Sequence, residues 1–188
     1  RHQEGKDYSF HDQVTIFVDG IQPDLSNNLP IGVMDTIIHC YAEAFFDFPP
    51  AIAMGAHEVL QSVTDRGYLM GLISNTGMTP GALFRRFLDS QDLLQFFQVL
   101  TFSDEVELCK PSRHIFDLTL KSLGASAGRT VHVGDHIKND ILGANQAGMI
   151  SVLVGNADGQ EKLAEPCVSI NDLRDLPHAL DKLMERPD

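Results

Sequence analysis

The chain has 188 residues, 43 % of them hydrophobic and 21 % charged, which is typical of one globular domain and excludes a disordered or disulfide-built protein. Its formal net charge of −12, with no opposing run of Lys and Arg, disfavours nucleic-acid binding. No apolar stretch reaches the roughly 20 residues of a membrane span and no signal-peptide pattern is present, so we expect a cytoplasmic protein that does not bind membranes.

Residues 1–48 are predicted to form a separate, helical unit. Apolar residues recur at helical spacing from Phe10 to Ile21, after Ser9, a suitable N-cap residue. A second helical stripe covers residues 33–46 and stops before Pro49. Within the first stripe, Val14–Val18 is rich in β-branched residues, so a strand is the alternative interpretation there.

Residues 49–188 are predicted to form an α/β core. Short apolar runs alternate with amphipathic helical patterns, which is typical of a parallel sheet flanked by helices. The expected strands are Leu69–Ile73, Val99–Phe102, Thr130–Val133, Ile150–Val154 and a weaker one at Val168–Ile170.

Three helices of this core have recognisable ends. One carries an apolar stripe up to Val63 and is closed by Gly67. The next is expected to begin with Thr79 as its N-cap and Pro80 at its first position. Another opens at Pro111 and Ser112, and Gly124 ends it.

The most specific segment for chemistry is the strand that ends in Gly134-Asp135. Asp140 follows within five residues, on the first turn of the next helix. Ligands of open α/β sheets bind beyond the carboxyl ends of the strands, and two carboxylates there suit Mg²⁺, which prefers oxygen ligands. The alternative is structural, because Asp140 is also a favourable charge near a helix N-terminus and Asp135 a turn former.

Two further segments offer phosphate-binding groups. The strand before Ser74 runs into Asn75 and Gly77, where a hydroxyl and backbone N–H groups can cradle phosphoryl oxygens, although the same residues are ordinary turn formers. Lys110 lies in a Cys-Lys-Pro segment between a loop and a helix, and a lysine there can neutralise phosphate charge. Each signal is weak alone, but they occur in order along one sheet.

The combination resembles a known family. Leu-Ile-Ser-Asn, then Lys-Pro-x-x-x-Ile-Phe, then Val-Gly-Asp-x-x-x-Asn-Asp with Gly143-Ala144 and Ala147-Gly148 is similar to motifs two, three and four of the haloacid dehalogenase-like (HAD) superfamily. The resemblance runs from Pro49 to Val154 and implies a Rossmann-like α/β core with a cap, here partial and helical.

The resemblance also implies roles for single residues. Ser74 and Asn75 would bind the phosphoryl group, and Lys110 would stabilise the negative charge of nucleophile and phosphate. Asp135 would ligate Mg²⁺, and Asp140 would support the metal's waters or Lys110. The Gly-Asp arrangement resembles the magnesium-dependent phosphatases of the superfamily more than its metal-independent dehalogenases.

Motif one of the family, a buried strand that ends in Asp-x-Asp, is missing from this sequence. The nearest imitation places Phe17 where the nucleophile belongs and Asp19 where the acid/base belongs. Motif one is then expected upstream of Arg1, and its strand, central in the family's sheet, should leave a gap. We expect an upstream segment, a strand of another chain, or Val14–Val18 to fill it.

Three functions follow as hypotheses. The first is a Mg²⁺-dependent phosphatase of a small phosphorylated metabolite in its complete form, with this chain inactive alone because it lacks the aspartate nucleophile. The second is a natural fragment or pseudoenzyme that acts as a binding module. The third is a haloacid dehalogenase. A homo-oligomer formed through exposed sheet edges is a possible assembly.

Several reactive residues are not assigned a function. His132 alternates with valines on a strand and is interpreted as a hydrogen-bonded core histidine, and His136 as a polar loop residue. Cys40, Cys109 and Cys167 are widely spaced and odd in number, so we expect reduced thiols, and no acid/base partner makes Cys109 a nucleophile.

Overall fold

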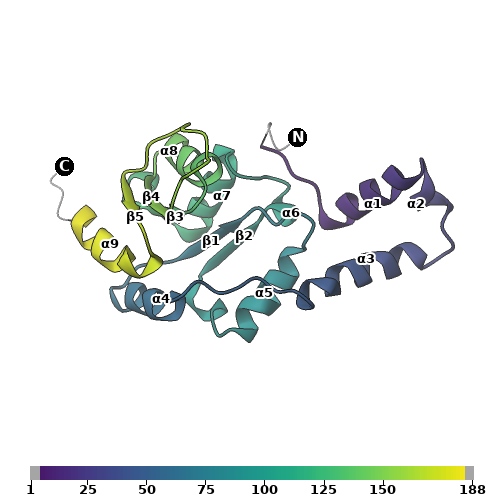
Figure 1. The fold of residues 1–188 in the computed structure, drawn as a ribbon, viewed down its shortest axis with the longest axis horizontal. Coiled ribbons are helices and arrows are strands. Elements are labelled where there is room, and N and C mark those ends of the chain that lie inside the picture. The colour runs from purple at the N-terminus through teal and green to yellow at the C-terminus, as the bar shows by residue number, and fades with distance from the viewer. Residues whose placement is uncertain (1–4, 185–188) are drawn as a thin grey trace.

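The computed structural model describes residues 5–184. A helical unit at the N-terminal end projects from an α/β body (Figure 1). It consists of α1 (Phe10–Ile21), α2 (Leu25–Asn28), α3 (Val33–Glu43) and the 3-10 turn η2 (Ala44–Phe46). Within the described residues, no helix has both the length and the apolar character needed to cross a membrane.

The helical interpretation of Val14–Val18 is confirmed, since these residues form the middle of α1. Ser9 caps the helix, and its hydroxyl accepts a hydrogen bond from the Asp12 backbone N–H at 3.1 Å. Val14 and Val18 are the buried residues of α1, whereas Phe17 on the other side is 53 % exposed. The alternative strand is therefore absent from these residues.

Contacts at both ends of the helical unit attach it to the body. Before α1, the Asp7 N–H donates to the Glu107 carbonyl at 3.0 Å and the Cys109 N–H to the Gly5 carbonyl at 3.1 Å. After α3, the ring of Phe45 packs against rings of α5 (Gly81–Ser90), the nearest being Phe84 at 5.1 Å between centroids. The first contact places residues 5–7 directly beside the segment that leads to Lys110.

The body alternates strands and helices, as predicted. After α4 (Ala56–Asp65), its main elements are β1 (Gly71–Ser74), α5, β2 (Val99–Phe102), α6 (Ser103–Val106), α7 (Arg113–Leu123), β3 (Val131–Gly134), α8 (Gly143–Gln146), β4 (Ile150–Val154), β5 (Val168–Ile170) and α9 (Leu176–Met184). All strand pairs are parallel. The predicted α/β class with a parallel sheet and flanking helices is confirmed.

The sheet consists of two pieces. β1 pairs with β2, and β3, β4 and β5 pair in that order. β1 lies on the side of the first piece that faces β3 (Figure 1). In agreement with this, Met70, just before β1, packs against the same hydrophobic cluster as Val131 and Val133 of β3. Within residues 5–184, no strand joins β1 to β3.

Helices cover both faces of the strands (Figure 1). On one face, α4 and α9 bury Val59, Val63 and Leu180 against Val152 of β4. On the other face, α7 and α8 bury Ile115, Phe116 and Ala144. Strands covered on both faces are nearly continuous apolar runs, which is why these strands were legible in the sequence.

One helix start differs from the prediction. α5 begins at Gly81 with Pro80 as its N-cap, one residue later than predicted with Thr79 as the N-cap. The Gly81 N–H donates to both carboxylate oxygens of buried Asp104, at 3.2 and 3.1 Å. A side chain of α6, which directly follows β2, thus accepts from the first helical N–H, so Thr79 is not needed as a cap.

Candidate active site

The predicted site residues converge on an ion pair between Lys110 and Asp140. The Lys110 Nζ lies 2.6 Å from the Asp140 Oδ1, and their side chains are only 13 % and 5 % exposed. Lys110 lies just before α7, and Asp140 lies on the π-helical segment Ile137–Leu142 that follows β3. The fold therefore brings together two groups that are 30 positions apart in the sequence, at the carboxyl ends of the strands.

His132 is the third member of this cluster. Its Nε2 lies 3.2 Å from the same Asp140 Oδ1, and its side chain is 11 % exposed. The ring meets Phe116 edge to face, with 5.0 Å between centroids. Burial lowers the pKa of His132 more than Asp140 raises it, so the imidazole is neutral at pH 7 and donates from Nε2, because a carboxylate only accepts.

Asp140 is held in its ionised form. Burial opposes ionisation, but the His132 hydrogen bond and the charge of Lys110 outweigh it and lower the pKa of Asp140 well below its usual range. The second oxygen, Oδ2, accepts from the His136 backbone N–H at 3.0 Å. Both carboxylate oxygens are thus occupied by protein donors.

Gly134 makes room for this carboxylate. A Cβ at position 134 would lie 2.6 Å from the Asp140 Oδ2, closer than such atoms approach in folded proteins. The glycine of the Val-Gly-Asp motif is therefore required by packing against Asp140. Gly143 has a similar explanation, since a Cβ there would lie 2.6 Å from the Phe116 ring.

Asn75 fixes the backbone of Lys110. Its Nδ2 donates to the Lys110 carbonyl at 2.9 Å, and its Oδ1 accepts from the Lys110 N–H at 2.8 Å. This pair of bonds ties the end of β1 to the lysine and sets the position from which the long side chain reaches Asp140. A role of Asn75 in phosphate binding stays a prediction.

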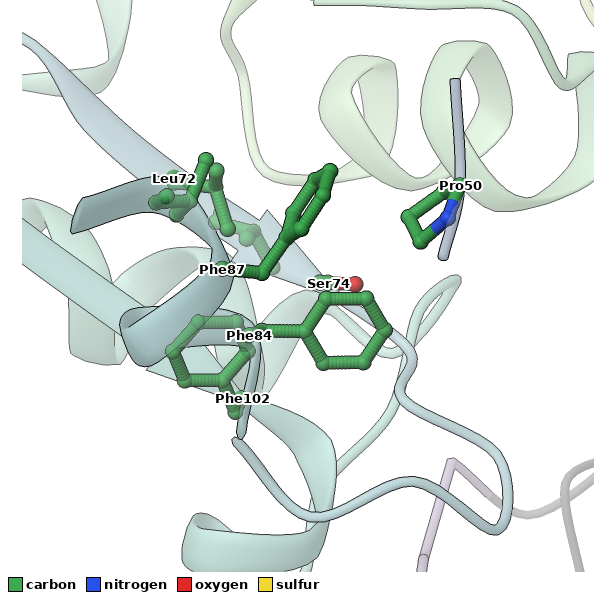
Figure 2. A pocket seen from close by; sticks show the side chains of 8 residues that line it. Pro50, Leu72, Ser74, Phe84, Phe87 and Phe102 are labelled. Atoms are coloured by element: carbon green, nitrogen blue, oxygen red, sulfur yellow. The ribbon is translucent and has the colours of Figure 1, made fainter. Parts of the chain in front are cut away.

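Ser74 is one of the residues that line an apolar cavity of about 260 Å³ (Figure 2). Its hydroxyl has no hydrogen-bond partner among residues 5–184, so it is available to a ligand. The cavity is lined by Pro50, Leu72, Ile73, Ser74, Phe84, Phe87, Leu88 and Phe102.

The turn after β1 is anchored by two buried polar residues of α6, which directly follows β2. The Thr76 N–H donates to the Ser103 Oγ at 3.0 Å, and the Thr76 hydroxyl donates to the Asp104 Oδ1 at 3.0 Å. Burial raises the pKa of Asp104, although the Gly81 and Thr76 hydrogen bonds oppose this. Ser103 and Asp104 therefore shape the loop around the site, a role that local sequence patterns did not distinguish from an ordinary loop.

Asp135 differs from Asp140 in being exposed, and its carboxylate has no hydrogen-bond partner in the described part of the chain. Gln160, in the loop after β4, holds the backbone around it. Its Nε2 donates to the Asp135 carbonyl at 2.9 Å, and its Oε1 accepts from the Ile137 N–H at 2.7 Å. Gln160 was missed because a lone glutamine in a loop, 25 positions away, carries no local signal.

The described residues do not by themselves form a metal-binding set. No group of three or more His, Cys, Asp or Glu side chains among residues 5–184 is arranged to hold an ion. Asp135 supplies one free carboxylate, whereas Asp140 is engaged with Lys110, His132 and the His136 N–H. As a direct ligand of Mg²⁺, Asp140 stays a prediction.

Comparison with known proteins agrees with the motifs. The chain is 35 % identical over 99 residues to a glyceraldehyde 3-phosphate phosphatase of Methanothermobacter thermautotrophicus, covering 52 % of this chain and 42 % of that protein. It is 29 % identical over 131 residues to pyrophosphatase PpaX of Halalkalibacterium halodurans, covering 68 % and 57 %. The chain thus spans about half the length of these curated relatives.

Solved structures share the fold. An uncharacterised protein from Listeria monocytogenes serotype 4b superposes with a TM-score of 0.68 at 27 % identity, over 75 % of this chain and 86 % of that one. A HAD phosphatase from Thermococcus onnurineus gives 0.60 at 23 % identity, over 94 % of both chains. The sequence profile of the haloacid dehalogenase-like hydrolases matches residues 12–154, so this chain belongs to that family.

Proposed function

We propose that this chain carries the phosphate-binding and charge-stabilising part of a phosphatase for a small phosphorylated metabolite. The observation that carries the proposal is the buried Lys110–Asp140–His132 cluster, located at the carboxyl ends of β1 and β3. Ser74 is the last residue of β1, and its hydroxyl has no hydrogen-bond partner among residues 5–184. A buried ammonium group held in place and a free hydroxyl are suitable partners for phosphoryl oxygens.

The names of relatives support the same class of substrate. Besides the two proteins above, a phosphoserine phosphatase of Thermus thermophilus is 29 % identical over 143 residues. These proteins are named for different phosphorylated compounds, so they support the phosphatase class and not one substrate. The apolar wall around Ser74 favours a substrate with little polar surface near its phosphate.

In this proposal, each residue has a distinct part. Lys110 neutralises phosphate charge, and Asp140 keeps the ammonium group aimed at the site while neutral His132 holds the carboxylate. Asn75 fixes the lysine backbone, and Ser74 donates to a phosphoryl oxygen. Residues 1–48 act as a partial cap on the core formed by residues 49–188, and exclude water when they close.

A bound Mg²⁺ ion would need more ligands than the described residues supply. Asp135 is the group that would contribute a carboxylate, and the ion would balance phosphate charge. Since the described residues form no complete set, we assign no step to the ion. The sequence also contains no Asp-x-Asp pair, so we propose that the chain has no nucleophile and does not hydrolyse phosphate esters alone.

Phosphate binding tests the assignment of Lys110. Titration of the chain with inorganic phosphate, followed by ³¹P NMR line broadening, should give saturable binding that Lys110→Met reduces roughly tenfold, as expected for loss of a charge-assisted contact. Lys121→Met, which removes an exposed lysine of α7, is the matched control and should bind as the wild type does. Equal binding by the two variants would refute the site.

A further inference from the structure

The cavity between α5 and the strands β1 and β2 has no part in the Lys110–Asp140–His132 cluster. Its volume is about 260 Å³, and Ser74 contributes the polar side chain of its lining (Figure 2). A dry, apolar cavity of about 150 Å³ already holds benzene, whereas pockets for drug-sized ligands begin at about 300 Å³. This space therefore fits one ring with a small substituent.

The cavity can be reached from the surface. Pro50, in the segment before α4, is exposed, and Leu72 and Phe84 are half-buried. Phe87 and Phe102 are buried. The lining thus runs from exposed residues inward to buried rings, so a small molecule can enter without unfolding of the chain.

The aromatic walls of the cavity are held in place by other rings. Phe84 stacks on Phe102, with 5.8 Å between centroids and 16° between ring planes. Phe45 of η2 meets Phe84 and Phe87 edge to face, at 5.1 and 5.8 Å between centroids. Walls that are already ordered lose little conformational freedom on binding. Aromatic rings also gain from edge-to-face and offset contacts with one another, which favours an aromatic ligand over an aliphatic one.

Ser74 gives the cavity one polar end. Ser74 and Leu72 lie on the same face of β1, because side chains alternate along a strand, and both line the cavity. The next residue, Asn75, holds the Lys110 backbone through two hydrogen bonds. The polar end of the cavity is therefore at the strand end that carries the proposed phosphate-binding residues.

We propose that this cavity binds one aromatic ring, with the Ser74 hydroxyl donating to an oxygen substituent of that ring. The identity of the natural ligand rests on the proposed function: it is an aryl phosphate, with its ring in the cavity and its phosphoryl group on the side of Lys110. A sugar phosphate would leave hydroxyl groups without hydrogen-bond partners against the apolar walls, which costs free energy. The cavity therefore selects aryl esters over polar ones.

Comparison of phenyl phosphate with methyl phosphate tests this inference, because the two esters share the charged group and differ in the ring. In ³¹P NMR titrations without added Mg²⁺, phenyl phosphate should bind roughly tenfold more tightly, as expected for burial of several apolar carbons. Leu88→Trp, which fills the cavity, should remove this advantage and leave methyl phosphate binding unchanged. Leu60→Trp, at a half-buried position of α4 outside the lining, is the matched control and should retain the advantage.

A second measurement needs no variant. The ring protons of bound phenyl phosphate should show nuclear Overhauser effects to the methyl groups of Leu72 and Leu88, which both line the cavity. Three results would overturn the aromatic site: equal affinities of the two esters, an advantage that Leu88→Trp retains, or Overhauser effects only to methyl groups outside the lining.

Phenol, which has no phosphate, separates this site from the proposed function. Overhauser effects from phenol to Leu72 and Leu88, without any binding of methyl phosphate, would refute the phosphate assignment and support the aromatic site. Saturable binding of methyl phosphate, without contact of either aromatic probe with these leucines, would refute the aromatic site and leave the phosphate assignment intact.

Discussion

At the scale of single residues, the site depends on the hydrogen-bond partners of the Asp140 carboxylate. One carboxylate binds the Lys110 ammonium group, the His132 ring and the His136 N–H. The motif letters predicted that these segments meet, but not that His132 takes part, because a histidine between two valines on a strand is as well explained by a core position. The contact with Asp140 follows only from the return of the chain after β3.

The buried histidine predicts a pH dependence of stability. Burial holds the folded pKa of His132 below its ordinary value of about 6.5, so on acidification the unfolded chain binds the proton first and the free energy of unfolding falls. Between pH 7.5 and 5, His132→Gln should lose about 1 kcal/mol less than the wild type, since one group contributes at most about 1.4 kcal/mol per pH unit.

Urea unfolding at the two pH values measures this difference. Asp140 also makes the free energy of unfolding fall on acidification, because its pKa is lower in the folded chain than in the unfolded one. Its stabilising contribution is complete above about pH 4 and is lost only below that value. The window from pH 7.5 to 5 therefore isolates the histidine. Identical pH slopes for both chains would mean that His132 is not buried in its neutral form.

Gly134 offers a packing test of the same cluster. Gly134→Ala places a methyl group against the Asp140 carboxylate and should destabilise the chain by about 1–3 kcal/mol, the usual cost of overpacking. Gly128→Ala is the control, since a Cβ there meets nothing within 4 Å. Thermal unfolding of both variants decides the matter, and equal melting temperatures would contradict the contact.

At the scale of elements, the strands were the most predictable part. The runs at Val99–Phe102, Ile150–Val154 and Val168–Ile170 form strands with the expected bounds, because buried parallel strands are continuous and apolar. β1 and β3 are shifted toward their carboxyl ends and include Ser74 and Gly134. Pairing with neighbours, which local sequence does not encode, draws these site residues into the ladder.

The helical N-terminal unit should be the least stable element. α2 and α3 contain no buried residue, whereas α7 buries Ile115, Phe116, Thr119 and Leu120. Amides of α3 should therefore exchange with solvent at least roughly 100-fold faster than those of α7, because local opening costs less where little apolar surface is buried. Hydrogen exchange followed by NMR measures both rates, and equal protection would contradict a loosely held cap.

At the scale of the whole molecule, the feature predicted from the sequence and seen in the structure is a break in the middle of the sheet. The family resemblance predicted a gap where the motif-one strand belongs, and the strands of residues 5–184 form two separate pieces at that place. Whether another segment supplies that strand and its aspartates stays a prediction. The break leaves backbone N–H and C=O groups at the inner edges of both pieces without the hydrogen bonds that a complete sheet would give them.

The most direct test of the missing nucleophile is hydrolysis of an aryl phosphate by the purified 188-residue chain in the presence of Mg²⁺, with EDTA and Asp135→Asn as controls. We expect no turnover above background in any of these samples, because the sequence has no Asp-x-Asp pair to accept the phosphoryl group. Turnover by the wild type that both EDTA and Asp135→Asn abolish would contradict this expectation, and would mean that a nucleophile exists among the residues assigned here to other roles.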